Sequence, residues 1–222
     1  YWLPGRLGRL MAQMDRHDFL ADDLLRVKEG REQEPAATLM GPRAVLPRSL
    51  TLAEFALANV SRMGRDRQEL GFLKPVMRRA FLERTGLSYD PGLRLGEDFL
   101  LYAQALARGA SFRLAPACGY VAVERSGSLS GRHRTEDLAA LAEACGKLIA
   151  DPALRAADRR ALQIHHRHLR AKLHHRRVLD TRRTGGMAQA LRCLASEPAN
   201  LAHIFKTTLI DKLKTHQQQK PV

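Results

Sequence analysis

The chain has 222 residues, 45% of them hydrophobic, with a formal net charge of +14, a composition typical of a folded globular protein. No stretch approaches the roughly 18 uncharged apolar residues of a spanning helix, and three scattered cysteines without a C-x-x-C pair disfavour a disulfide framework or structural zinc site and favour a reducing, cytoplasmic setting. The positive charge indicates an anionic partner: nucleic acid, a membrane surface or a phosphate-bearing substrate.

The first 60 residues predict mixed structure. Pro4 can open a short helix because apolar residues follow it at helical spacing. A strand or extended segment is expected over 18–27, and 29–47 is rich in Gly and Pro and predicts irregular structure. Thr51 with Glu54 three residues later is the pattern of a capping box, which predicts a helix through residue 60.

The segment 70–130 predicts alternating helices and strands. Residues 70–75 are expected to be extended, and Pro75 to open a helix that Gly86 stops. Glu97 and Asp98 begin the next helix, and two short strands follow near 112–114 and 120–123.

After residue 130 the sequence predicts helices alone. Apolar residues form a stripe over 138–148, and further helices are expected over 152–181, 189–196 and 198–214. The sequence therefore predicts the α/β fold class over 1–130, a helical extension over 131–216 and a frayed tail over 217–222.

The acidic pair Glu97-Asp98 is the most informative local feature. It lies directly before an apolar helical run, where free backbone amides and the helix dipole favour carboxylates. Such a pair often serves only as a cap. A carboxylate at a loop–helix junction with basic residues nearby can instead act as a general base on an acceptor hydroxyl.

The motifs of 70–130 together resemble the C-terminal half of a GT-A glycosyltransferase of family 2, the group that includes bacterial exopolysaccharide enzymes of the succinoglycan type. The runs that carry the resemblance are Gly71-Phe72-Leu73-Lys74-Pro75, Tyr89-Asp90, Leu95-Gly96-Glu97-Asp98-Phe99 and Arg125-Ser126-Gly127-Ser128. The resemblance implies half of a Rossmann-like domain followed by a basic helical tail. It implies Asp98 as the base that deprotonates the acceptor hydroxyl, Glu97 as a supporting carboxylate, and transfer of the sugar with inversion.

The start of the chain, Tyr1-Trp2-Leu3-Pro4-Gly5-Arg6-Leu7, resembles the segment that follows a D-x-D metal motif in this family. The resemblance thus places the Mg²⁺- or Mn²⁺-binding aspartates and the nucleotide-binding half before Tyr1, and no metal or cofactor is expected in these 222 residues, which alone should be inactive. Asp22-Asp23 could be mistaken for the metal motif. We expect these two aspartates and Asp18 to line the acceptor side or to be solvated.

Other substrate-binding candidates are basic and hydroxyl residues. Lys74, Arg78 and Arg79 precede or begin a predicted helix and can hold phosphate or sugar hydroxyls, or form a solvated face. Arg125, Ser126 and Ser128 form either a loop facing the diphosphate, as the resemblance suggests, or a plain turn.

The segment 151–183 carries ten basic residues against three acidic ones, a net charge of +7, interleaved with five histidines. His165 and His168 lack an acidic partner at metal-ligand spacing. A basic helix is also the electrostatic footprint of nucleic-acid binding, but no aromatic stacking platform accompanies it. An anionic membrane surface suits enzymes that extend lipid-linked sugars, and a solvated basic face is the plain alternative.

The sequence therefore predicts part of an inverting glycosyltransferase. It would move a sugar from a nucleotide-sugar donor to a saccharide or lipid-linked acceptor in cell-surface polysaccharide synthesis, in the cytoplasm or at the inner face of the plasma membrane. The alternative is a basic helical module that binds nucleic acid or acidic partners.

Overall fold

The computed structural model describes residues 1–34, 36–60, 68–125, 133–202 and 204. The ranges predicted for a frayed tail, 217–222, and for most of the last helix lie outside these residues. The helices and strands, in chain order, are α1 (Arg6–Met11), β1 (Phe19–Asp22), β2 (Leu25–Lys28), β3 (Ala37–Thr38), β4 (Arg48–Ser49), α2 (Leu52–Ala58), η1 (Leu70–Phe72), β5 (Val76–Met77), α3 (Arg79–Thr85), α4 (Glu97–Ala107), β6 (Phe112–Ala115), β7 (Val121–Glu124), α5 (Thr135–Ile149), α6 (Ala156–Ser196) and η3 (Pro198–Asn200).

The strands form two small mixed sheets. The larger has the order β4-β6-β1-β5, in which β1 and β6 are parallel and the outer strands are antiparallel to their neighbours. The smaller has the order β3-β2-β7, with β2 and β7 parallel. The predicted α/β class is confirmed at this level, although the single strand expected over 18–27 is two strands that belong to different sheets.

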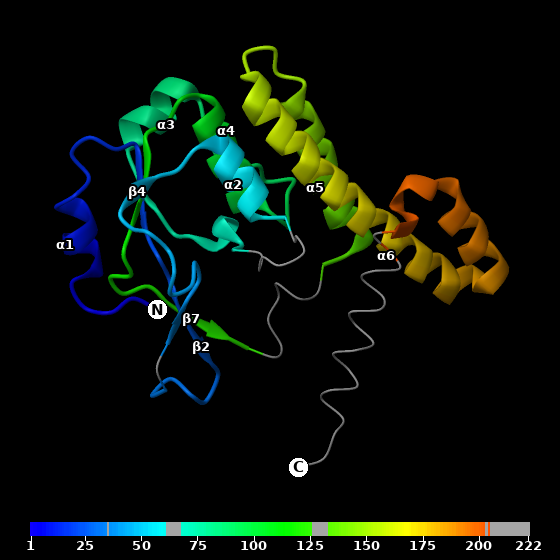
Figure 1. Cartoon of the computed structure of the whole chain (residues 1–222), viewed down its shortest axis with the longest axis horizontal. Coiled ribbons are helices and arrows are strands. Elements are labelled where there is room, and N and C mark those ends of the chain that lie inside the picture. The colour runs from blue at the N-terminus through cyan, green and yellow to red at the C-terminus, as the bar shows by residue number, and fades with distance from the viewer. Residues whose placement is uncertain (35, 61–67, 126–132, 203, 205–222) are drawn as a thin grey trace.

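Strand β1 lies at the centre of the core, and all four of its residues are buried. Leu20 packs with Leu10 and Met14 of the α1 region. Phe19 points to the other face, where its ring stacks on Phe112 at 5.3 Å and meets Tyr102 of α4 edge-on. Helix α1 therefore covers one face of the larger sheet, and α2 and α4 cover the other (Figure 1).

Local chemistry explains two of the helix ends. Thr51 accepts from the backbone of Glu54 and the Glu54 side chain accepts from the backbone of Thr51, so the predicted capping box of α2 is confirmed. Gly86 ends α3 in the left-handed conformation with a φ of 62°, as expected for a C-cap glycine.

Two expectations between residues 70 and 79 are wrong. Residues 70–72 form the short 3₁₀ helix η1, and Pro75 does not open a helix, because Val76 and Met77 pair with β1 before α3 begins at Arg79. Long-range pairing with Phe19 therefore overrides the local signal of Pro75.

The helical region packs onto the same core as the sheet. Helix α6 lies against α2 and α5 (Figure 1), and Leu141, Cys145 and Leu162 belong to the buried cluster that contains Phe19. Buried Asp158 of α6 accepts from the Ala53 amide at 3.1 Å, which satisfies a free N–H in the first turn of α2. One core thus joins residues on both sides of position 130.

Helix α6 consists of two helical segments that meet at Gly186, where φ is 77° and ψ is −174°. The predicted helices over 152–181 and 189–196 correspond to these segments. The second segment returns along the first, and the imidazole Nε2 of His174 lies 2.8 Å from the carbonyl oxygen of Cys193. Within the described residues, no helix is long and apolar enough to cross a membrane.

Candidate active site

The acidic pair lies in the first turn of α4, as predicted. Gly96 precedes the helix with a φ of 71° and its carbonyl accepts from Leu100 at 2.9 Å. A left-handed N-cap favours glycine, and a Cβ at this position would lie 2.6 Å from Cδ2 of Leu141. Gly96 therefore lets α5 approach the start of α4 and directs Glu97 and Asp98 from the free amide end of the helix.

Two side chains from outside this turn bind the Asp98 carboxylate, and a third lies beside it. Lys74 Nζ forms an ion pair with Oδ2, the Tyr89 hydroxyl donates to Oδ1 at 2.8 Å, and the Tyr102 hydroxyl lies 3.4 Å from Oδ1. The carboxylate keeps 17% of its side-chain surface exposed. Asp98 is therefore fixed in position but remains accessible.

The two tyrosines serve as hydrogen-bond donors because they stay protonated. Burial, followed by the hydrogen bond to Asp98, raises the pKa of Tyr89 to about 12. Burial, with the Asp98 charge nearby, also raises the pKa of Tyr102, whose hydroxyl donates to the Leu73 carbonyl at 2.9 Å. The Tyr89 hydroxyl therefore donates to the Asp98 carboxylate, and the Tyr102 hydroxyl donates to the Leu73 carbonyl.

A cavity of about 870 Å³ opens beside this carboxylate. One side is formed by η1, the loop before α4 and the first turn of α4, and the other by the start of α5 and the middle of α6. Its acidic side chains are Glu69, Glu97, Asp98 and Asp137, and its basic or imidazole side chains are Arg94, His133, Arg134, His165, His168 and Lys172. The volume lies in the range of small-molecule sites.

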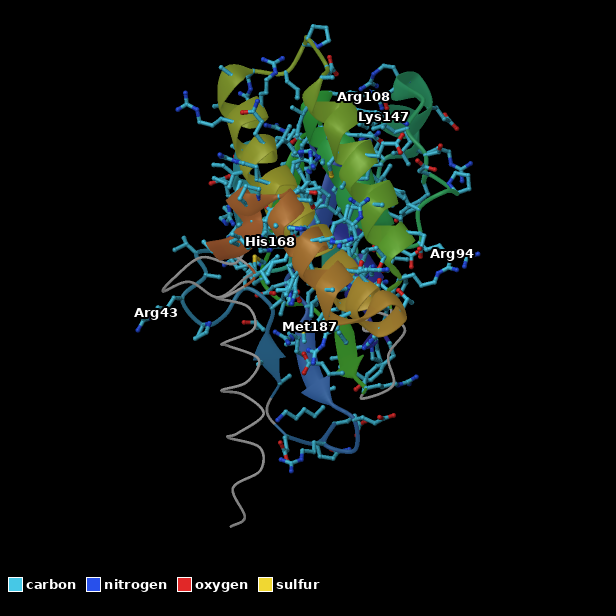
Figure 2. The ribbon with its side chains drawn as sticks, turned by 90° about the vertical axis from the view of Figure 1, so that its right-hand side faces the viewer. Arg43, Arg94, Arg108, Lys147, His168 and Met187 are labelled. Atoms are coloured by element: carbon cyan, nitrogen blue, oxygen red, sulfur yellow. The ribbon has the colours of Figure 1, made fainter. Side chains whose placement is uncertain are left out.

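The two sides of the cavity differ in charge. Three of the four carboxylates belong to the side of α4 and η1, whereas five of the six basic or imidazole side chains belong to α6 and to the residues at the start of α5. Asp137 of α5 lies 3.8 Å from Arg134 and also accepts from the Arg134 amide, so it acts within its own helix end. His168 is seen in Figure 2, which faces the side of the molecule that α6 forms.

Aromatic stacking fixes the distance between the two sides. The Phe99 ring stacks on Phe55 of α2 with centroids 5.0 Å apart. It also stacks on the imidazole of His165 of α6 at 4.1 Å. Because Phe99 follows Asp98 directly, this stack sets the position of α6 relative to the carboxylate.

The arrangement suits proton abstraction from a hydroxyl. A carboxylate that is held by fixed donors and borders a cavity can accept a proton from a group bound there. The mixture of carboxylates, basic groups and apolar side chains around the cavity suits a polyhydroxylated ligand, because hydroxyl groups both donate to carboxylates and accept from cations.

The predicted substrate-binding residues do not gather at one site in the structure. Lys74 contacts Asp98, as described. Arg78 donates to the backbone carbonyls of Met14 and His17, at 3.0 and 3.2 Å, and so braces the turn before β1. Arg79 is exposed at the start of α3, and Arg125 lies 3.7 Å from Glu29 in an exposed pair. None of these three arginines lines the cavity; Ser126 and Ser128 lie outside the described residues.

Asp22 and Asp23 are not solvated, because both are buried, at 1% and 2% exposure, and neither lines the cavity. Arg6 donates to Asp22 Oδ1 at 2.6 and 3.0 Å. Burial opposes ionisation of Asp22, but the bonds from Arg6 and Cys118 outweigh it and lower its pKa. Burial raises the pKa of Asp23, whose Oδ1 accepts from the Met40 amide at 3.2 Å.

No group of three or more His, Cys, Asp or Glu side chains among the described residues could hold a metal ion. Asp22 is already committed to Arg6, and the histidines of α6 do not converge with carboxylates into such a group.

Several cavity residues were not identified from the sequence. His165, His168 and Lys172 lie at spacings of three and four residues, so one face of a helix carries all of them. That spacing could have predicted that the three side chains line one site. Tyr89 stands in the run Tyr89-Asp90, but nothing in that run indicated its contact with Asp98, which depends on how the loop over 88–95 folds back.

Comparison with known proteins gives two curated relatives, both from Rhizobium meliloti (strain 1021). The chain is 43% identical over 215 residues to succinoglycan biosynthesis protein ExoU, covering 96% of this chain and 61% of that protein. It is 30% identical over 218 residues to succinoglycan biosynthesis protein ExoO, covering 89% of this chain and 61% of that protein.

No protein-family model matches the chain. The chain is therefore similar over most of its length to two proteins of succinoglycan biosynthesis, and it spans about 61% of the length of each.

Proposed function

We propose that the chain is part of a glycosyltransferase that acts in exopolysaccharide synthesis. The observation that carries the proposal is the Asp98 carboxylate, held by Lys74 and Tyr89 at the edge of a cavity of about 870 Å³. The printed names of the two relatives support the setting, since both describe succinoglycan biosynthesis. The finer assignment is a GT-A enzyme of family 2, for which this chain supplies the acceptor side.

In this proposal the acceptor saccharide occupies the cavity with one hydroxyl against Asp98. Asp98 takes the hydroxyl proton as that oxygen attacks the anomeric carbon of the donor sugar. The bond from the anomeric carbon to the nucleoside diphosphate breaks on the opposite face, so the configuration inverts and the diphosphate leaves with the electron pair. Glu97 supports the acceptor from the same helical turn.

The remaining parts of the enzyme belong to the same proposal. The nucleotide-sugar donor, and the Mg²⁺ or Mn²⁺ ion expected with its diphosphate, would be bound outside the described residues. Saccharide and lipid-linked saccharide acceptors are both compatible with a cavity that combines carboxylates, cations and apolar side chains. The enzyme would work in the cytoplasm or at the inner face of the plasma membrane.

The test is a transfer assay with the whole enzyme that contains this chain. Labelled nucleotide sugars are supplied with acceptors extracted from exopolysaccharide-producing membranes. Asp98→Asn keeps the shape and the hydrogen bond from Tyr89 but removes the base, so transfer should fall by about 10² to 10⁴-fold while donor binding, measured by calorimetry, stays unchanged.

Asp90→Asn is the matched control, because Asp90 is an exposed loop aspartate whose side chain, within the described part of the chain, accepts from the nearby Gly92 amide at 2.8 Å. It should leave transfer unchanged. Undiminished turnover in Asp98→Asn would remove Asp98 from the reaction, and absence of transfer from every nucleotide sugar by the intact enzyme would overturn the proposed activity.

A further inference from the structure

The end of α6 carries an exposed combination of apolar and basic side chains that the proposed reaction does not use. We define this region, residues 176–192, as the α6 tip. It contains the bend at Gly186, and Figure 1 shows the two helical segments meeting there on the side of the molecule away from the sheets. The exposed cationic side chains of the tip are Arg177, Arg182, Arg183 and Arg192.

Three apolar side chains are exposed within the same region. Met187 and Leu191 are 55% and 56% exposed, and Leu179 is 38% exposed. Met187 and Leu191 are four residues apart on one helical segment, so they lie on one face, and Met187 is labelled in Figure 2. Exposed leucine and methionine beside arginines are the composition of helices that lie in a membrane interface.

The base of the tip is anchored, which makes it a fixed projection of the fold. Arg176 donates to the carbonyl of His133, and the Thr135 hydroxyl donates to Asp180, so the start of α5 holds this part of α6. On the other side, the return segment is tied back by the contact between His174 and the Cys193 carbonyl at 2.8 Å. Asp180 is the one acidic residue of the tip against five arginines, which leaves a net charge of +4.

From these observations we infer that the α6 tip docks on an anionic membrane surface. The arginines bind lipid phosphates, and Met187 and Leu191 enter the boundary between headgroups and acyl chains. Within the basic segment 151–183, we therefore assign membrane binding to the C-terminal end alone. At the N-terminal end, Arg155 and Arg159 are already engaged with Asp158 and with the Asp151 carbonyl.

Other partners fit the tip less well. Nucleic-acid surfaces use aromatic stacking or polar contacts, whereas the tip exposes aliphatic side chains, and the sequence has no Phe, Tyr or Trp between Tyr120 and Phe205. Protein interfaces are rich in aromatic anchors, and three separated apolar side chains do not provide the roughly 800 Å² per partner of a stable interface.

Docking through the tip would place the cavity close to the membrane. Lys172 lines the cavity, and Arg183 of the tip lies 11 positions further along α6, which corresponds to about 16 Å along the axis. The cavity would therefore face acceptors near the lipid surface. The docking itself stands apart from the sugar-transfer proposal, because its measurement needs no substrate.

The experiment is vesicle flotation of the 222-residue chain at low salt. Vesicles of phosphatidylcholine with 30% phosphatidylglycerol, a composition of about the anionic content that basic segments recognise, are compared with pure phosphatidylcholine. The wild-type chain should float only with the anionic vesicles. Arg182→Gln with Arg183→Gln should weaken partitioning by about 30-fold, and Met187→Ser with Leu191→Ser by about tenfold.

Two matched double variants serve as controls. Arg160→Gln with Arg167→Gln removes the same charge from exposed positions in the first third of α6, and Leu7→Ser with Met11→Ser removes exposed apolar side chains from α1. Both should partition like wild type, and circular dichroism verifies that all variants are folded.

Equal losses in the control and tip variants would overturn the inference, because binding would then depend on overall charge or hydrophobicity. So would absence of flotation. Salt-sensitive binding to duplex RNA or DNA that needs the arginines but not Met187 and Leu191, without vesicle binding, would replace the membrane by a nucleic acid. Self-association in light scattering that Met187→Ser abolishes, again without flotation, would replace it by a second copy of the chain.

Discussion

Lys74 and Asp98 form an ion pair that joins the segment before β5 to the first turn of α4. The sequence suggested Lys74 as a substrate ligand, but in the structure its ammonium group holds the proposed base. Lys74 is thus better described as a positioning residue, and kinetics can separate the two roles.

Lys74→Met in the whole enzyme should lower kcat by about 100-fold, the cost of a small displacement of a catalytic group, with little change in KM. Lys74→Arg should restore part of the rate, because a guanidinium can also pair with the carboxylate. Steady-state kinetics measures both. A rise in KM with unchanged kcat would instead assign Lys74 to substrate binding.

Gly96 should tolerate no side chain, for two separable reasons. Gly96→Ala places a Cβ at a φ of 71° and 2.6 Å from Cδ2 of Leu141. Gly86→Ala is the matched control, because Gly86 has a φ of 62° but open space around it. Gly86→Ala should cost about 1–2 kcal/mol of the free energy of unfolding, and Gly96→Ala more.

Urea unfolding measures this difference. If contact with Leu141 adds to the backbone cost, Gly96→Ala should be less harmful in a Leu141→Ala background than in the wild-type background. Equal costs for the two glycines, together with additivity with Leu141→Ala, would contradict the proposed close approach of α5 to the start of α4.

Removing the charge of Asp22 should destabilise the fold strongly. Arg6 and Asp22 are both buried, so Asp22→Asn leaves a guanidinium without its carboxylate, which costs about 3–5 kcal/mol. Glu124→Gln is the control, because its pair with Arg26 is exposed and should be worth less than about 1 kcal/mol.

The same pair predicts a pH dependence. The pKa of Asp22 is lowered in the folded state, so its stabilising effect is present above the ordinary carboxyl pKa and is lost as the pH falls. The wild-type chain should therefore lose stability more steeply than Asp22→Asn below about pH 4. Parallel curves for the two proteins would contradict this assignment.

Tyr89 should contribute to the loss of stability at high pH. Its pKa rises from 10.0 to about 12 in the folded state. The unfolded chain therefore loses the Tyr89 proton at a lower pH than the folded chain does. Stability associated with Tyr89 is complete below pH 10 and falls as the pH rises toward 12. Tyr89→Phe should reduce this slope, measured from urea midpoints across that range. An unchanged slope would mean that Tyr89 is not held by Asp98.

The sequence was sufficient to predict the elements whose structure is determined by residues close to one another along the chain. The capping box of Thr51 and Glu54, and the glycine with an acidic pair before α4, each act within one helical turn, and both were correctly predicted. Strand β5 forms because Val76 pairs with Leu20, which is more than 50 residues away along the chain. The 3₁₀ helix η1 depends on a contact between the Gly71 amide and the Asn59 side chain. No local pattern indicates them.

The candidate site divides in the same way. Asp98 could be found from its place in the sequence, but Tyr89 and Lys74 reach it through loops, and His165 reaches Phe99 through tertiary packing of α6. The burial of Asp22 and Asp23 was missed because it depends on Arg6 and on the Met40 amide, which lie on other segments.

The stack of Phe55, Phe99 and His165 has a consequence for any attempt to produce the α/β part separately. A polypeptide that ended near residue 125 would leave Phe99 uncovered on one side and the α2 start without Asp158. We expect such a shortened product to aggregate on expression and to be recovered by supplying residues 133–202 as a second polypeptide, which would make the two pieces a split-protein pair.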